Sequence, residues 1–335
     1  MRQLARVVKI DGIEPIQDAE FIELAVVGGW KVVVKKAEYQ IGDLAIYVEI
    51  DAFLPEGNQL WQFLVDKSSR EFEGARGHVL RSVKLRGKVS QGLLLPLVEN
   101  HPLGTDLTEA LGIIKYEPPI PAQLAGKVKG RFPSVIPKTD QERIQNLADE
   151  WDEIKSKSYE VTEKVEGSSM TAYLLKGEFG VCSRNLNLLE DENNTLWKVA
   201  IAQNLEDKLR TIFGDNAAFQ GELIGEGIQG NYYKIKGHKF LIYDIYDIAK
   251  GEYLSPESRR LLCEDHNIDH VPILWEDFSL DNSGDSIDYL IEISNGSSKI
   301  NQQKKREGMV FKSTGSSEQR ISFKVISNAY LLSQK

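Results

Sequence analysis

Apolar and polar residues alternate in short runs along the first hundred residues, and turn-forming residues separate these runs. Strands are predicted over residues 21–27 and 30–35, on either side of a turn at Gly28 and Gly29. Runs with the same alternation follow over residues 43–50 and 92–97. Because such short strands bury one face only by packing on one another, the pattern predicts a small β-barrel or β-sandwich.

A proline-rich segment interrupts this pattern at residues 116–121. It contains Pro118, Pro119 and Pro121. Proline has no backbone donor and restricts the residue before it, so neither a helix nor a strand ladder continues through the segment. We therefore predict one domain over residues 1–118 and a second over residues 119–335.

Helical spacing recurs at three places in the second domain. Thr139 and Glu142 have the spacing of a capping box, which predicts a helix from there to Ile154. A second helix is expected over residues 195–212, and a third begins at Ser255, where a capping residue precedes proline. The apolar residues expected to face inward are Ile144, Leu147, Trp151 and Ile154 in the first helix, and Leu196, Val199, Leu205 and Leu209 in the second.

Strands account for most of the remaining second domain. They are expected over residues 173–182, 219–224, 238–248, 308–312 and 321–326, together with the β-branched stretch around residues 161–164. Strands mixed with separate helices predict an α+β domain with two antiparallel sheets and a cleft.

Composition narrows the setting of the protein. No run of about 18 apolar residues occurs and the amino terminus has no signal-peptide pattern, so we expect a soluble cytoplasmic protein with no membrane partner. We also expect a monomer. Cys182 and Cys263 lack the spacing of a disulfide framework or a zinc site, and we expect buried thiols.

The net charge of −9 argues against a polyanionic partner, but the basic residues are clustered. No acidic residue interrupts residues 76–90, and a second cluster covers residues 304–306. Such clusters are commonly solvated surface, but a basic stripe also favours nucleic acid. The basic residues of the first cluster are Arg76, Arg81, Lys84, Arg86 and Lys88.

The most informative motif is the sequence Lys-Val-Glu-Gly from Lys164 to Gly167, within an extended stretch. Alternation along a strand places Lys164 and Glu166 on one face, and Gly167 allows close approach of a ligand. A lysine with its usual pKa of about 10.4 is a poor nucleophile, so burial or a nearby cation must lower this pKa. Lys324 or a bound metal could supply that cation. Glu166 would raise the lysine pKa, so we assign it an orienting or metal-contacting role.

Further polar residues lie at or near the ends of other predicted strands. Alone, a strand glutamate is more commonly solvated or paired, and a strand aromatic residue more commonly belongs to the core. In chain order these residues are Arg184, Glu222, Tyr243, Glu307, Lys312 and Lys324.

Taken together and in this order, the segments resemble the motifs of the covalent nucleotidyltransferases: ATP-dependent DNA ligases, RNA ligases and mRNA capping enzymes. The resemblance implies that Lys164 becomes covalently attached to a nucleoside monophosphate. It also implies that the side chain or backbone of Glu163 contacts the adenine amino group. The remaining implied contacts are ribose or phosphate for Arg184, ribose or metal for Glu222, the purine for Tyr243, a metal-bound water for Glu307, and phosphates for Lys312 and Lys324.

Residues 1–98 resemble the amino-terminal OB module of one RNA ligase family of bacteria and some protists. The matching segments include residues 22–25, 29–36, 42–47 and 85–96. DNA ligases and capping enzymes place this module after the catalytic domain, and only 11 residues follow Lys324, so we expect no second module there. The implied fold is α+β: an amino-terminal OB-type β-barrel followed by an adenylyltransferase domain of two antiparallel sheets with flanking helices. Many RNA ligases carry a lysine where this chain has Ser322, whose role is unassigned.

The resemblance implies an ATP-dependent RNA ligase that uses Mg²⁺ or Mn²⁺. Lys164 would take AMP from ATP, AMP would pass to a 5′-phosphate, and a 3′-hydroxyl would then attack and release AMP. The implied substrate is RNA ends at a nick in a duplex, held by the OB module. Two alternatives stay open: another covalent nucleotidyltransferase, either a DNA ligase or a capping guanylyltransferase, and a non-catalytic nucleic-acid-binding protein.

Overall fold

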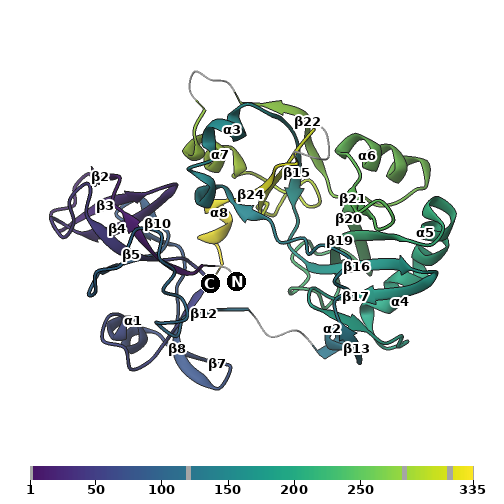
Figure 1. Ribbon diagram of the computed structural model, residues 1–335, viewed down its shortest axis with the longest axis horizontal. Coiled ribbons are helices and arrows are strands. Elements are labelled where there is room, and N and C mark those ends of the chain that lie inside the picture. Colours follow the sequence, from purple (N-terminus) through teal and green to yellow (C-terminus); the bar gives the residue numbers. More distant parts are fainter. Residues whose placement is uncertain (1–2, 118–121, 281–284, 315–319, 335) are drawn as a thin grey trace. The chain divides into compact units, whose positions relative to one another are not determined.

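The computed structural model describes residues 3–117, 122–280, 285–314 and 320–334 (Figure 1). The chain divides into two compact units. Unit 1 comprises Met1–Pro119, Gln145–Asp149 and Leu331–Lys335, and unit 2 comprises Ile120–Ile144 and Glu150–Tyr330. The predicted boundary at residues 118 and 119 lies outside the described residues. No helix among those residues is long and apolar enough to cross a membrane.

Unit 1 is built from small antiparallel sheets, and the strands predicted from alternation are confirmed. One sheet has the order β1-β5-β11 and another β2-β3-β4. Their bounds are β1 Ala5–Lys9, β2 Gly12–Pro15, β3 Ile22–Val27, β4 Trp30–Lys35, β5 Leu44–Val48 and β11 Leu93–Pro96. Strand β5 serves two cores, because Ile46 and Val48 pack in one apolar cluster while Ala45 and Tyr47 pack in another.

Unit 1 also contains a four-stranded sheet and a separate two-stranded hairpin. The sheet has the order β12-β6-β8-β7, and the hairpin pairs β9 with β10. The elements are β6 Ala52–Pro55, α1 Gln62–Lys67, β7 Arg70–Phe72, β8 Ala75–Val79, β9 Val83–Leu85, β10 Lys88–Ser90 and β12 Ile114–Lys115.

Unit 2 contains a seven-stranded and a five-stranded sheet, as the α+β prediction requires (Figure 1). The seven strands in order are β13 Val128–Arg131, β18 Leu186–Leu188, β17 Glu178–Cys182, β16 Ser168–Leu175, β19 Ala217–Gly225, β20 His238–Asp247 and β21 Glu252–Tyr253. The five strands in order are β14 Glu142–Arg143, β24 Ser322–Ile326, β23 Gly308–Ser313, β15 Ser158–Lys164 and β22 Ile273–Ser279. All pairs are antiparallel except the pairing of β14 with β24.

The predicted strand over residues 173–182 is wrong as a single element. Residues 176 and 177 form a tight turn between β16 and β17. Lys176 has φ 53° and Gly177 has φ 76°, the left-handed pair that a two-residue hairpin turn requires. The turn was missed because the apolar alternation runs on through both strands.

The helix predicted over residues 195–212 is two helices, α4 Thr195–Ala202 and α5 Leu205–Phe213. Asn204 between them has φ 51°, which ends helical geometry. All four residues predicted to face inward are buried in the main core of unit 2. That core also contains Ala172, Phe219 and Ile242, so α4 and α5 cover one face of the seven-stranded sheet. The third predicted helix is confirmed as α6 Pro256–Asp265, with Ser255 as its cap.

Three further helices are α2 Ala122–Ala125, α7 Ile287–Ser294 and α8 Asn328–Leu331. All lie in unit 2 except Leu331, the last residue of α8.

The helix predicted from Thr139 to Ile154 is wrong. Glu142–Arg143 is the parallel strand β14, Ile144–Leu147 is a 3₁₀ turn, and α3 begins only at Trp151 and ends at Lys155. The backbone of this segment bonds to distant partners, including β24 and Gly29, whose N–H donates to Gln145 O at 3.3 Å. Tertiary pairing therefore replaces the local helical preference.

Residues Gln145–Asp149 belong to unit 1. The side-chain oxygen of Asn146 accepts from Trp30 Nε1 at 2.8 Å and from Arg6 Nη2 at 3.3 Å. A Cβ atom at Gly29 would lie 2.6 Å from Gln145 Cα and 2.9 Å from Gln145 O. Both are backbone atoms, so the close approach of these two segments requires glycine.

We predict that Gly29→Ala lowers the free energy of unfolding by about 1–3 kcal/mol, the usual cost of overpacking. Gly12→Ala is the matched control, because its Cβ would meet no atom closer than 3.6 Å. Urea denaturation of both variants measures the difference. Equal midpoints for the two variants would contradict the role of this contact.

Candidate active site

Four of the predicted site residues meet beside the end of β15. Lys164 ends this strand and pairs with Gly308 of β23, which places Glu307 next to it. Lys164 Nζ donates to Glu307 Oε1 at 2.6 Å. Burial would lower the pKa of Lys164, but Glu307, Glu222 and Glu166 outweigh it and raise the pKa. Without a ligand, the lysine is therefore a charged ammonium, and the predicted nearby cation must offset three carboxylates.

Glu166 follows β15 and is held at two atoms. Its backbone N–H donates to Tyr233 Oη at 2.8 Å, and one carboxylate oxygen accepts from the hydroxyl of Tyr330. Burial, and then the charge of Glu307, raise the pKa of Glu166 to about 7.

Glu222 lies on β19, on the sheet face opposite α4 and α5. Burial raises its pKa to about 8. A Cβ at Gly167 would lie 2.5 Å from Leu223 O and 2.8 Å from Glu222 Cγ. Glycine at position 167 therefore allows the turn after Lys164 to lie against β19. This packing requires glycine whether or not a ligand also approaches Gly167, as the sequence predicted.

This group of carboxylates suits a hard divalent cation. Burial and mutual repulsion make the ionised forms of Glu166 and Glu222 unfavourable, which a cation would reverse. Among the described residues, no three His, Cys, Asp or Glu side chains lie close enough to hold a metal by themselves. Mg²⁺ and Mn²⁺ commonly keep water and phosphate ligands in such sites, so the residues present fit a metal bound partly through water.

Glu163 points away from Lys164. Its Oε2 accepts from the backbone N–H of Lys299 at 2.7 Å, and the side chain is buried. Alternation along β15 produces this arrangement. The Glu163 side chain therefore binds the loop at residues 298–299. Only the backbone of Glu163 lies beside Lys164.

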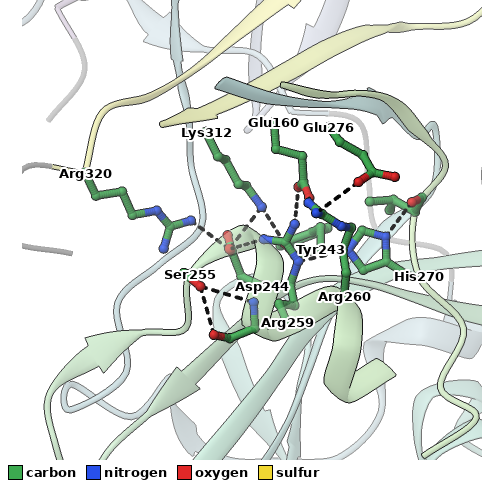
Figure 2. Close-up of polar contacts among 12 residues, drawn as sticks. Glu160, Tyr243, Asp244, Ser255, Arg259, Arg260, His270, Glu276, Lys312 and Arg320 are labelled. Carbon is green, nitrogen blue, oxygen red and sulfur yellow. Dashed lines mark hydrogen bonds and ion pairs between the residues drawn. The ribbon is translucent and has the colours of Figure 1, made fainter. Parts of the chain in front are cut away.

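Tyr243 and Lys312 meet at a second position, between the two sheets (Figure 2). Tyr243 Oη lies 2.9 Å from Thr139 Oγ1. Lys312 Nζ donates to the carbonyl of Tyr243 and lies 3.0 Å from Asp244 Oδ1. Lys312 is 1% exposed, and burial is the largest cause that lowers its pKa, to about 7. The ammonium predicted to bind phosphate is here bound by protein oxygens.

Asp244 belongs to a buried network of charges that the sequence analysis missed (Figure 2). It lies 2.7 Å from Arg320 Nη2 and 3.6 Å from Arg259 Nη1. Arg259 also pairs with Glu160, so the network joins β15, β20 and β23 to α6. Burial would raise the pKa of Asp244, but Lys312 and the two arginines outweigh it and lower the pKa. The available signal was an aspartate inside the apolar strand β20.

The other predicted residues are spread around these two groups. Arg184 Nη2 donates to Asp140 Oδ1 at 2.8 Å. Lys324 pairs with Val310 on β23, and alternation places it on the same face of the sheet as Lys164. Ser322, the unassigned residue, donates its hydroxyl to Gln141 Oε1.

The second basic cluster has structural partners. Lys304 Nζ lies 5.0 Å from the centre of the Tyr232 ring, and Lys305 Nζ donates to Ala329 O at 3.2 Å. The Arg306 guanidinium donates to three carbonyls at the end of α7, those of Ile293, Ser294 and Asn295. These contacts hold the segment that precedes Glu307.

Comparison with known proteins agrees with this architecture. The RNA ligase family model matches residues 157–326, and a model of an OB-fold domain matches residues 4–97. None of the curated proteins compared matches the chain.

Solved structures of Naegleria gruberi RNA ligase are similar over the whole chain. The form with pyrophosphate is 43% identical, with a TM-score of 0.92 over 100% of this chain and 99% of that one. A mutant with AMP and Mn is 43% identical, with a TM-score of 0.91 over 98% of each chain. A mutant with ATP and Mn is 42% identical, with a TM-score of 0.92 over 99% of each chain.

The chain belongs to the RNA ligase family, with an OB-fold domain before the ligase domain. The predicted α+β fold and the predicted enzyme class, an ATP-dependent RNA ligase, are confirmed. The predicted cofactors agree with the ATP, AMP and Mn that those similar structures contain.

We predict that Asp244→Asn lowers the free energy of unfolding by about 3–5 kcal/mol at pH 7, because it removes the carboxylate that Lys312, Arg259 and Arg320 surround. Glu276→Gln is the control. Glu276 is 71% exposed and pairs with Arg260 at 3.2 Å, so its loss should cost under about 1 kcal/mol.

Denaturation at several pH values measures both effects. The lowered pKa of Asp244 means that its stabilisation is complete above the unfolded-state pKa of about 3.9 and is lost as the pH falls through the folded value. The difference between Asp244→Asn and wild type should therefore shrink in acid. A variant as stable as wild type at pH 7 would show that the network contributes nothing.

Proposed function

We propose that this protein joins 3′-hydroxyl and 5′-phosphate ends of RNA through a covalent adenylate on Lys164. The observation that carries the proposal is the position of Lys164 at a strand end, bonded to Glu307 and surrounded by carboxylates, within an RNA ligase domain. The similar Naegleria structures contain ATP, AMP and pyrophosphate, which are the substrate and the products of adenylate transfer and release.

The first step forms a bond between Lys164 Nζ and the α-phosphorus of ATP and breaks the bond to pyrophosphate. The attacking amine must be neutral, so the ammonium first loses a proton. A divalent cation at Glu166, Glu222 and Glu307 would neutralise these carboxylates and stabilise charge on the phosphates. With these carboxylates neutralised, burial lowers the pKa of Lys164. The proton leaves along the existing bond to Glu307 Oε1 and passes on to solvent, so Glu307 remains a carboxylate.

The following steps transfer AMP to the 5′-phosphate and then replace it by the 3′-hydroxyl. Arg184 and Lys324 supply positive charge for the phosphates, and Tyr243 supplies a ring for the purine. Lys312 would reach a phosphate only after release from Asp244, so we assign it first to holding the Tyr243 backbone.

The OB-fold domain offers a basic hairpin for nucleic acid. Residues 86 and 87, with φ 46° and 82°, form the turn between β9 and β10, and Lys84, Arg86 and Lys88 are exposed around it. Arg76 differs, because it donates to Ser69 Oγ at 3.0 Å and lies 3.9 Å from Glu56. We therefore propose that the hairpin contacts the phosphates of a nicked RNA duplex, with Arg81 at its base. A monomeric state and a cytoplasmic location stay predictions.

The central test is labelling of the protein with ATP that carries radioactive phosphorus at the α-position. Wild type is expected to retain the label through denaturing electrophoresis, and Lys164→Ala is expected to lose it. Lys129→Ala, at an exposed position on β13, should label like wild type. An unlabelled wild type, or a variant at Lys164 that still labels, would falsify the covalent mechanism. Labelling from GTP in place of ATP would favour a capping enzyme.

The hairpin is tested by replacing Lys84, Arg86 and Lys88 together with alanine. Adenylate formation should be unchanged, because the site of attack lies in the ligase domain. Sealing of a nicked RNA duplex should fall about tenfold or more at physiological salt. The slope of the logarithm of the binding constant against the logarithm of the salt concentration should become less steep by about one unit per lost phosphate contact. The control replaces three exposed lysines of unit 1 outside the hairpin, Lys35, Lys36 and Lys67. Equal losses in both triple variants would contradict a specific role.

A further inference from the structure

Tyr330 is a buried tyrosine whose hydroxyl reaches the candidate active site. It lies on α8, directly after strand β24, and is 6% exposed. Its hydroxyl donates to Glu166 Oε2. None of the sequence motifs includes this residue.

The position of Tyr330 is fixed from the same segment that holds Glu307. Ser327 Oγ accepts from the backbone N–H of Tyr330 at 3.1 Å, and Ser327 N donates to Glu307 O at 2.9 Å. Asn295 Oδ1 in turn accepts from Ser327 Oγ at 2.9 Å and from the N–H of residue 329 at 3.0 Å. These hydrogen bonds therefore fix the position of the Tyr330 backbone relative to the backbone of Glu307.

The Tyr330 ring is also packed, which separates the role of the ring from that of the hydroxyl. Tyr232 meets it edge-on, with ring centres 5.9 Å apart at 77°. The Tyr232 hydroxyl donates to Lys305 O at 2.7 Å and not to Glu166. Tyr330→Phe would keep this ring packing and remove the bond of the hydroxyl to Glu166.

Glu166 needs such a donor. Its carboxylate shares a buried site with Glu307, and two neighbouring carboxylates repel each other. Its backbone is anchored by Tyr233, but the carboxylate could still turn about its side-chain torsions. The Tyr330 hydroxyl, as a donor, can fix one oxygen of this group.

We propose that Tyr330 is a positioning residue for nucleotide transfer: its hydroxyl holds the carboxylate of Glu166 beside Lys164. The inference rests on the proposed function, since it assigns to Glu166 a part in the attack of Lys164 on ATP. The bond that the structure shows for the Tyr330 hydroxyl goes to Glu166. Its removal should therefore slow the transfer without weakening the binding of ATP.

The test is the single-turnover rate of lysyl-adenylate formation in Tyr330→Phe over a range of ATP concentrations. Loss of a hydrogen bond to a charged group costs about 1.5–3 kcal/mol, so the rate at saturating ATP should fall about 10-fold or more. The ATP concentration at half-maximal rate should stay within about twofold, because the lost bond does not touch the nucleotide. Tyr232→Phe removes the neighbouring hydroxyl and is expected to match wild type within about twofold.

A double-variant cycle with Glu166→Ala separates positioning from a general structural role. If Tyr330 acts through Glu166, adding Tyr330→Phe to Glu166→Ala should change the rate less than about twofold. A further tenfold loss in that background, an equal loss in Tyr232→Phe, or a wild-type rate in Tyr330→Phe would each overturn the inference while the ligase function stands. A wild type that forms no adenylate overturns both. Coupling of the same two changes in urea denaturation checks that the bond exists in folded protein.

Discussion

The antiparallel pairing of β15 with β23 is the constraint on which the rest of the site depends. Because Lys164 pairs with Gly308 and Glu160 pairs with Lys312, one register places both Lys164 beside Glu307 and a buried carboxylate beside a buried lysine. A slip of one residue would turn Lys164 to the opposite face, where Glu163 now bonds to the loop at Lys299. The contacts of Arg306 with the end of α7 hold the start of β23 and so help to maintain this register.

The paired strands β15 and β23 carry two different electrostatic environments along their length. At one end the carboxylates outnumber the lysine and raise its pKa, which suits a site that becomes active when a divalent cation binds. Further along, Lys312, Arg259 and Arg320 surround Asp244, and burial lowers the pKa of Lys312. Buried charges of this kind fix geometry more than they add stability, because each must be desolvated before it can pair. Here they hold the backbone of Tyr243 in place.

The predictions that held and those that failed have different physical causes. Strands β3 and β4 and the cap of α6 were predictable, because alternation and capping act between neighbours in sequence. The helix expected before Ile154 failed because β24 and Gly29 bond to that backbone. The long strand failed at the left-handed pair Lys176 and Gly177, and the long helix failed at the left-handed residue Asn204. A periodic pattern does not reveal such residues. Network members such as Arg259 were missed because their partners lie far away in the chain.

By itself, the sequence determined the family and the order of the two domains and predicted Lys164 as the reactive lysine, because these depend on motifs that stay together along the chain. Only the tertiary structure decided what surrounds that lysine. It turned Glu163 away, bound Lys312 to Asp244, paired Ser322 with Gln141 and brought Tyr330 to Glu166. Glu166 and Tyr330 are 164 residues apart in the chain. No local pattern encodes such a contact, since burial and strand register act only once distant segments have packed together.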